Sequence, residues 1–262
     1  MPRDSAAMNE VLSEVSRLPL HTVVELQSPD GRQVFVLGES HVKTRRAAEL
    51  CRRAVESFSL RGVERLQREN VFAGELLGAF FEKVRGALEL LSGGQLAGST
   101  IEVALDLREG NTVELERTER VPASLNVGTG YLGVYTTVVL PALLLMPLWG
   151  GVAALRPLRA ALRLVGLHLY ALPLAYALRD RPWGWAIQPL ITILTVRDEL
   201  LADGIRRMLA THPAAPALVI VGRAHVPGVV DRLLGQGFRR LGPEARTRGV
   251  LQRGPGLAGL DS

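Results

Sequence analysis

The sequence predicts an α/β (α+β) fold in which a central mixed β-sheet is flanked by helices. Two observations predict the sheet: apolar, β-branched runs end in glycine at Gly38 and again at Gly222, and each is followed by a segment with helical spacing. A third observation concerns the middle of the chain, where residues 131–196 are mostly apolar and interrupted by proline and glycine. We expect residues 1–262 to form one domain that carries residues 131–196 as an apolar helical insertion.

The N-terminal part reads as a hairpin followed by alternating helices and a strand. The runs "TVVEL" and "QVFVL" within residues 21–40 are joined by "SPDGR", whose residue types favour a turn. Apolar residues at helical spacing then predict a helix over residues 42–58, and residues 59–64 form a short strand candidate. A long helical pattern over residues 66–91 ends at the breaker "SGG".

The C-terminal part repeats this alternation after the apolar insertion. Residues 99–122 combine a helical start with "GNTVELE", which is typical of a turn and a strand. Residues 197–213 predict an amphipathic helix, residues 217–222 a buried strand and residues 225–237 another helix. The segments "FRRLG" and "RGVLQR" are candidates for edge strands. Strands that alternate with helices favour a sheet covered by helices.

The composition excludes some classes of function. The net charge is +5, but the positive residues are nearly all arginine and form no dense run interleaved with aromatic residues, so we expect no nucleic-acid binding. The single cysteine, Cys51, rules out a disulfide within the chain and fits a small core residue. Residues 1–20 are polar and helix-like and lack the apolar centre of a secretory signal, which indicates a cytoplasmic location for the first half of the site.

Two Gly-x-x-His motifs stand out, "GESH" at residues 38–41 and "GRAH" at residues 222–225. Random placement of 27 glycines and 5 histidines in 262 residues predicts about 0.5 such pairs. Each motif follows a strand, so His41 and His225 are expected at the carboxyl edge of the sheet, where open α/β sheets bind ligands. The positive end of the following helix disfavours protonation, and neutral imidazole is the form that binds a metal.

A metal held by two histidines needs a further ligand, which is usually a carboxylate. Glu39 lies within the first motif, Glu64 ends the next strand, and Asp198 follows Arg197 in the helix before the second motif. Two histidines and a carboxylate with open positions suit a hydrolytic divalent metal. The alternative is that each histidine only caps or hydrogen-bonds near its strand end. We interpret the other histidines, His21, His168 and His212, as structural, and expect His168 in the apolar middle to have a partner.

The two motifs resemble those of the TraB/PrgY family, with which GumN-like proteins and Tiki metalloproteases are grouped. The segments that resemble the two family motifs are "VFVLGESHV" and "LVIVGRAHVPGV", the latter followed by "LLGQGF". In addition, "GVERLQR" supplies Glu64, and "VRDELLADGIRRML" supplies the Arg197–Asp198 pair. The resemblance covers residues 22–64 and 195–242. The first motif departs from the usual Gly-Thr-x-His and is more similar to erythromycin-esterase and ChaN-like folds, so Glu39 is either an extra site carboxylate or a replacement for a hydroxyl.

The resemblance implies two functions of different classes. The Tiki branch implies a hydrolase that acts on peptides with a divalent metal such as Mn²⁺, Co²⁺ or Zn²⁺. In such a hydrolase the metal ligands would be His41, His225 and Glu64. Glu64 could instead be the general base, and Arg197 would stabilise a developing oxyanion. The PrgY branch implies a membrane-associated binding or regulatory protein without chemistry, of the kind that reduces export or activity of a peptide pheromone.

The apolar insertion raises the question of a membrane. Residues 131–155 carry no charge and are long enough to span a hydrocarbon core, in which case residues 160–178 must return and keep both motifs on one side. Such a hairpin would put Arg156 and Arg159 on the far side, against the positive-inside rule. The alternatives are a helical pair at the membrane interface or a lid over the site. We expect association with the cytoplasmic membrane and a site on its cytoplasmic side, or otherwise a cytoplasmic protein; the sequence carries no signal for the oligomeric state.

Overall fold

A six-stranded mixed sheet lies at the centre of the molecule. The computed structural model describes residues 5–40, 43–65, 74–93, 96–97, 99–107, 109–116, 121–149, 151, 156–178, 187–212 and 216–241. The strands of the sheet are β1 (Thr22–Gln27), β2 (Gln33–Glu39), β4 (Leu60–Val63), β6 (Asn111–Glu114), β7 (Ala217–Gly222) and β8 (Arg239–Leu241). Their order is β6-β4-β7-β2-β1-β8. The strands β6, β4, β7 and β2 run parallel to one another, β1 runs antiparallel to β2, and β8 runs antiparallel to β1.

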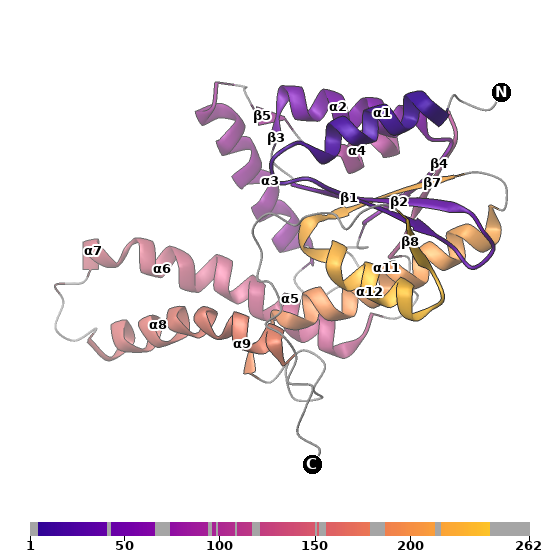
Figure 1. Cartoon of the computed structure of the whole chain (residues 1–262). Coiled ribbons are helices and arrows are strands. Elements are labelled where there is room, and N and C mark those ends of the chain that lie inside the picture. The colour runs from indigo at the N-terminus through magenta and orange to yellow at the C-terminus, as the bar shows by residue number, and fades with distance from the viewer. Residues whose placement is uncertain are drawn as a thin grey trace, which may run out of the picture.

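Helices cover both faces of this sheet (Figure 1). One face packs against α1 (Ser5–Ser16), α2 (Arg45–Ser57) and α4 (Thr100–Asp106), and the other against α11 (Ile191–Thr211) and α12 (Val226–Gly235). The strands β3 (Lys43–Thr44) and β5 (Leu96–Ala97) form a separate two-stranded pair, and α3 (Gly74–Leu91) lies beside it.

The core has two layers because successive strand residues point to opposite faces. Val36 and Val219 are in register and face α11 and α12, whereas Phe35 and Ile220 face α1 and α2. Every residue of β7 is buried, as expected for a parallel strand covered on both faces. Cys51 is fully buried in the α1–α2 layer, which confirms its interpretation as a core residue.

The predicted elements near both ends of the chain are confirmed, and the α/β fold class is correct. The hairpin is β1–β2, residues 28–32 form its turn, and β8 is an edge strand. One boundary differs: the helix predicted from residue 197 begins at Ile191, because Ile191 and Thr192 are buried where the helix packs against α5. The segment "RGVLQR" and residues 66–73 lie outside the described residues.

The apolar middle of the chain forms a two-limbed helical arm that begins at Ala123, eight residues before the predicted insertion, whereas residues 191–196 of that insertion belong to α11. Its first limb runs through α5 (Ala123–Val134), a π-helical turn (Tyr135–Val139), α6 (Leu140–Leu144) and α7 (Met146–Trp149). Its second limb runs through α8 (Arg156–His168), a 3-10 turn (Leu169–Ala171) and α9 (Leu172–Ala177). Figure 1 shows α6 and α7 beside α8, projecting away from the sheet.

The base of the arm is fixed to the sheet-covering helix α11. A Cβ atom at Gly128 would lie 2.2 Å from Oγ1 of Thr192, so α5 lies directly against α11 and only glycine fits there. His168 of the second limb contacts the first limb, because its Nδ1 lies 2.8 Å from the Tyr131 hydroxyl. Its Nε2 lies 2.5 Å from the carbonyl oxygen of Ile187, just before α11. His168 therefore has the partners that its apolar surroundings predict.

Candidate functional site

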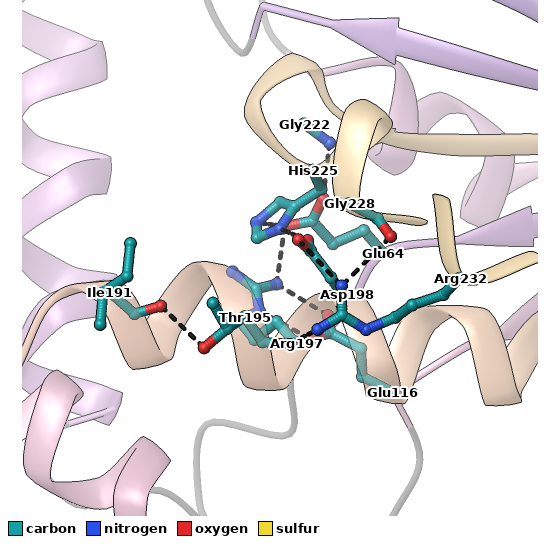
Figure 2. Close-up of polar contacts among 10 residues, drawn as sticks. All are labelled: Glu64, Glu116, Ile191, Thr195, Arg197, Asp198, Gly222, His225, Gly228 and Arg232. Carbon is teal, nitrogen blue, oxygen red and sulfur yellow. Dashed lines mark hydrogen bonds and ion pairs between the residues drawn. The ribbon is translucent and has the colours of Figure 1, made fainter. Parts of the chain in front are cut away.

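The carboxyl ends of the four parallel strands meet at one edge of the sheet and present several acidic residues. β2 ends at Glu39, β7 at Gly222, and Glu64 and Glu116 follow β4 and β6. These acidic side chains divide between the two faces of the sheet. Glu64 and Glu116 lie on the α11 side together with Arg197, Asp198 and His225, as Figure 2 shows.

Glu64 is held in place through both of its carboxylate oxygens. Its Oε1 accepts a hydrogen bond from Nη2 of Arg197 at 2.6 Å, and its Oε2 accepts one from the backbone N–H of Gly222 at 2.5 Å. The backbone N–H of Glu64 donates to the Ile220 carbonyl at 2.9 Å, which continues the pairing of β4 with β7. The side chain is only 6% exposed, so it is fixed at the predicted place at the end of the strand.

Arg197 joins two carboxylates across the ends of neighbouring strands. It binds Glu116 through Nε at 2.6 Å and Nη2 at 2.7 Å, in addition to its bond to Glu64. Burial by itself would lower the pKa of the guanidinium, but the charges of Glu64 and Glu116 outweigh burial and raise that pKa above its ordinary value. Arg197 is therefore a permanent cation whose described bonds go to acidic residues.

Glu116 is a site residue that the sequence interpretation missed. It is completely buried, two residues after the end of β6, and it contacts the same guanidinium as Glu64. The available signal was the segment "GNTVELE", which places a carboxylate just beyond a strand. Only the parallel pairing of β6 with β4 reveals that the two glutamates lie side by side.

His225 lies in the 3-10 turn Arg223–His225 that connects β7 to α12. Its Nδ1 lies 2.7 Å from Oδ1 of Asp198, while its Nε2 lies 3.6 Å from Oε1 of Glu64. A carboxylate bonded to Nδ1 keeps the proton on that nitrogen, so in the neutral ring Nε2 carries a lone pair directed towards Glu64. The structure thus brings His225 close to both Asp198 and Glu64.

Asp198 is enclosed by the first turn of α12. A Cβ atom at Gly228 would lie 1.8 Å from Oδ2 of Asp198, so the "HVPG" sequence of the second motif allows this helix to rest on the carboxylate. Burial raises the pKa of Asp198, and the hydrogen bond from His225 opposes that rise. The only cation near its Oδ2 within the described residues is Arg232, whose Nη1 lies 3.8 Å away.

Glu39 lies on the opposite face of the sheet and is not brought together with Glu64 and His225. It forms a buried ion pair with Lys43, and its Oε1 accepts hydrogen bonds from the Ser99 hydroxyl at 2.9 Å and the Thr100 N–H at 3.1 Å. It therefore binds the N-terminus of α4. The physical reason is strand alternation: the preceding residue, Gly38, faces α12, where an added Cβ would lie against Val226.

His41, the remaining predicted ligand, lies outside the described residues. Within the described part of the chain, no three His, Cys, Asp or Glu side chains converge as a metal site. A metal at His225 and Glu64 would therefore need another ligand, and His41 is the one that the sequence predicts.

Comparison with known proteins identifies no related family, protein or structure. No protein-family model matches the chain, and the searches of curated proteins and of solved structures give no significant match. The resemblance to the TraB/PrgY family thus rests on the quoted motifs alone. Functional proposals depend on the geometry of the site itself.

Proposed function

We propose that the protein is a divalent-metal-dependent hydrolase that acts on peptides, with its site at the α11 side of the sheet edge. The observation that supports this most is the 3.6 Å separation of Nε2 of His225 from Oε1 of Glu64. With the Nδ1 proton committed to Asp198, a neutral His225 presents a lone pair to a carboxylate oxygen. Two facing acceptors repel each other unless a proton or a cation lies between them.

The charges around this pair favour a cation. Three buried carboxylates, those of Glu64, Glu116 and Asp198, are opposed by Arg197 and by the more distant Arg232. Among the described residues the carboxylates therefore outnumber the arginines by one, and a proton on His225 or a divalent cation would neutralise this excess. His225 and Glu64 supply one nitrogen and one oxygen ligand, a donor set that suits Mn²⁺, Co²⁺ or Zn²⁺, and His41 is the proposed third ligand.

Each residue then has a defined part in hydrolysis. A bound divalent metal would supply an acidified water and a polarised carbonyl group. Asp198 holds His225 in one tautomer, and Arg197 orients Glu64, which serves as a ligand or accepts the water proton at a carboxylate oxygen. Nη1 of Arg197 makes no hydrogen bond within the described residues, and we assign to it the stabilisation of the developing oxyanion.

One observation favours a second candidate, a binding or regulatory protein that does no chemistry. Both oxygens of Glu64 are already bonded, one to Arg197 and one to the Gly222 N–H. The same network would serve simply to tie α11 to the ends of β4, β6 and β7. In that case a protonated His225 completes the network by sharing its charge between Asp198 and Glu64.

Metal content separates the two candidates. Elemental analysis of the purified protein is expected to find one Mn, Co or Zn per chain, and added metal should raise the thermal midpoint by several degrees. His41→Ala, His225→Ala and Glu64→Gln should lose the metal and the hydrolysis of peptides. His212→Ala is the matched control, because His212 lies at the end of α11 and the described hydrogen bonds of its ring go to Thr211 and Met208. A metal-free protein whose midpoint does not respond to these ions would support the second candidate instead.

A further inference from the structure

The arm, defined as residues 121–149 and 156–178, exposes an unusual number of large apolar side chains. On its first limb these are Val127, Val134, Val138, Leu144 and Leu145, and on its second limb Leu158, Leu164, Val165, Leu167, Tyr170 and Leu174. Exposed apolar residues scattered singly are ordinary, but a contiguous helical pair that carries so many marks an interaction surface. Two stretches of the arm, Ala123–Leu144 and Arg156–Ala175, are long and apolar enough to cross a membrane by length and composition alone.

The charges of the arm indicate the chemistry of its partner. Residues 121–178 contain no acidic residue, and their only charged side chains are Arg156, Arg159 and Arg163. These three follow one stripe of α8, at positions i, i+3 and i+7. Two residues after each arginine, and so on the opposite side of the helix, come Leu158, Ala161 and Val165, all of them partly or fully exposed. A basic stripe opposite an apolar one is typical of a helix that lies in the surface of an anionic membrane.

The geometry of the arm favours this surface mode over crossing. Leu125, Gly128 and Thr129 are buried where α5 packs against α11, and the part of the first limb beyond α5 comprises residues 135–149. At 1.5 Å per residue that part is about 22 Å long, shorter than a hydrocarbon core of about 30 Å. In addition, Arg163 is exposed in the middle of α8, where a crossing limb would leave its charge within the hydrocarbon.

We propose that the arm binds the surface of an anionic phospholipid bilayer, with the three arginines among the lipid phosphates and the exposed apolar side chains in the outer part of one leaflet. The arm does not cross the bilayer. This binding is independent of whether the site is a hydrolase, because no residue of the site takes part in it. Its basis is the pairing of an exposed apolar surface with a purely positive charge.

Vesicle sedimentation with the full-length protein tests the proposal. The protein should bind vesicles of phosphatidylcholine with phosphatidylglycerol, bind pure phosphatidylcholine much more weakly, and be released in part by high salt. Replacing Arg156, Arg159 and Arg163 together by Gln should weaken binding about 100-fold. The matched control replaces Arg45, Arg46 and Arg53, which are exposed on α2, by Gln; it removes the same charge and should retain binding.

A second pair of variants tests the apolar part. Leu158→Gln with Val165→Gln should weaken vesicle binding about tenfold, since each replaces an apolar side chain buried in lipid by a polar one. Leu90→Gln with Leu91→Gln at the exposed end of α3 is the control and should leave binding unchanged. An unchanged thermal midpoint in each variant will show that the fold is intact.

Three results would overturn the proposal. The first is a loss of selectivity: either the protein binds neutral and anionic vesicles equally, or the control variants on α2 or α3 weaken binding as much as the variants on the arm. The second is quenching of a fluorophore at Gly151→Cys only by a quencher trapped inside the vesicles, which would show that the arm crosses. The third is an absence of vesicle binding while the apolar variants convert a dimer to a monomer, which would assign the surface to a second copy of the chain.

Discussion

Glu39 and Glu64 end two strands at the same edge of the sheet, yet their surroundings differ in kind. Glu39 faces α4, where Lys43, the Ser99 hydroxyl and the Thr100 N–H satisfy it. Glu64 faces α11, where an arginine is shared with a second carboxylate and a histidine nitrogen lies 3.6 Å away. Glu39 is balanced by its own cation, whereas Glu64 belongs to a group in which, among the described residues, three carboxylates face two arginines.

This difference teaches how one sheet edge can hold a self-contained ion pair on one face and the site that we propose on the other. A carboxylate paired with a lysine and helix N–H groups has no remaining demand for a ligand. Three carboxylates beside Arg197, the more distant Arg232 and a histidine are the arrangement from which we propose a bound proton or metal. The face on which a residue lies, and so its position in the strand, decides between them.

The largest expected effect is on the Glu39 side. Lys43→Met leaves the Glu39 carboxylate buried without its cation, which should lower the free energy of unfolding by about 3–5 kcal/mol. Urea denaturation measures this loss. The double variant Glu39→Leu/Lys43→Met should recover most of it, because an apolar pair carries no desolvation cost. A single variant as stable as the original protein would show that Glu39 does not depend on Lys43.

A slightly smaller loss is expected on the Glu64 side. Arg197→Met leaves Glu64 and Glu116 adjacent without the cation between them, at a cost of about 3 kcal/mol at neutral pH. Urea denaturation at neutral pH measures this loss. Arg206→Met on the same helix is the control, since its ion pair with Asp203 is exposed and should contribute less than about 1 kcal/mol. A loss in Arg197→Met no larger than that in Arg206→Met would show that Glu64 and Glu116 do not depend on the guanidinium between them.

A third prediction concerns ligand affinity rather than stability. Asp198→Asn removes the carboxylate that fixes the Nδ1 proton of His225, so the affinity for Mn²⁺, Co²⁺ or Zn²⁺ should fall about 10–100-fold. Titration calorimetry with the metal-free protein measures this change. Glu39→Gln should leave the affinity unchanged, provided that the variant is folded, because Glu39 lies on the other face. An equal fall in both variants would mean that the two faces are not separate.

The smallest effect is a pH dependence on the Glu39 side. His21 is buried before β1, and its Nε2 has no hydrogen-bond partner within the described part of the molecule. Burial lowers its pKa, so the folded protein takes up this proton less readily than the unfolded chain. The stability that His21 contributes is therefore present above about pH 6.5 and is lost as the pH falls through the lower folded pKa. Denaturation of His21→Leu should give a flatter pH profile in this range; identical profiles would contradict the assignment.

The sequence predicted the elements well because their signals are local. The hairpin, α2, β7 and α12 each follow from spacing and turn residues, and Glu64, Asp198 and His225 do converge at one edge. What it could not predict depends on pairing between distant segments. The face of Glu39 follows from the register of β2, and the role of Glu116 from the neighbourhood of β6 and β4. The ion pairs of Arg197 with Glu116 and Glu64 could not be predicted either, because these carboxylates lie 81 and 133 residues away in the chain.

Two glycine contacts of α11 limit the insertions and deletions that the molecule tolerates. Thr192 rests on Gly128 of the arm and Asp198 on Gly228 of α12, six positions apart on a single helix. One residue inserted between them would rotate everything beyond it by about 100°, and both contacts could not be kept. An extra turn in α6 or α8 would only lengthen the projecting limbs. Natural variants should therefore differ freely in the reach of the arm while the spacing from Thr192 to Asp198 stays constant.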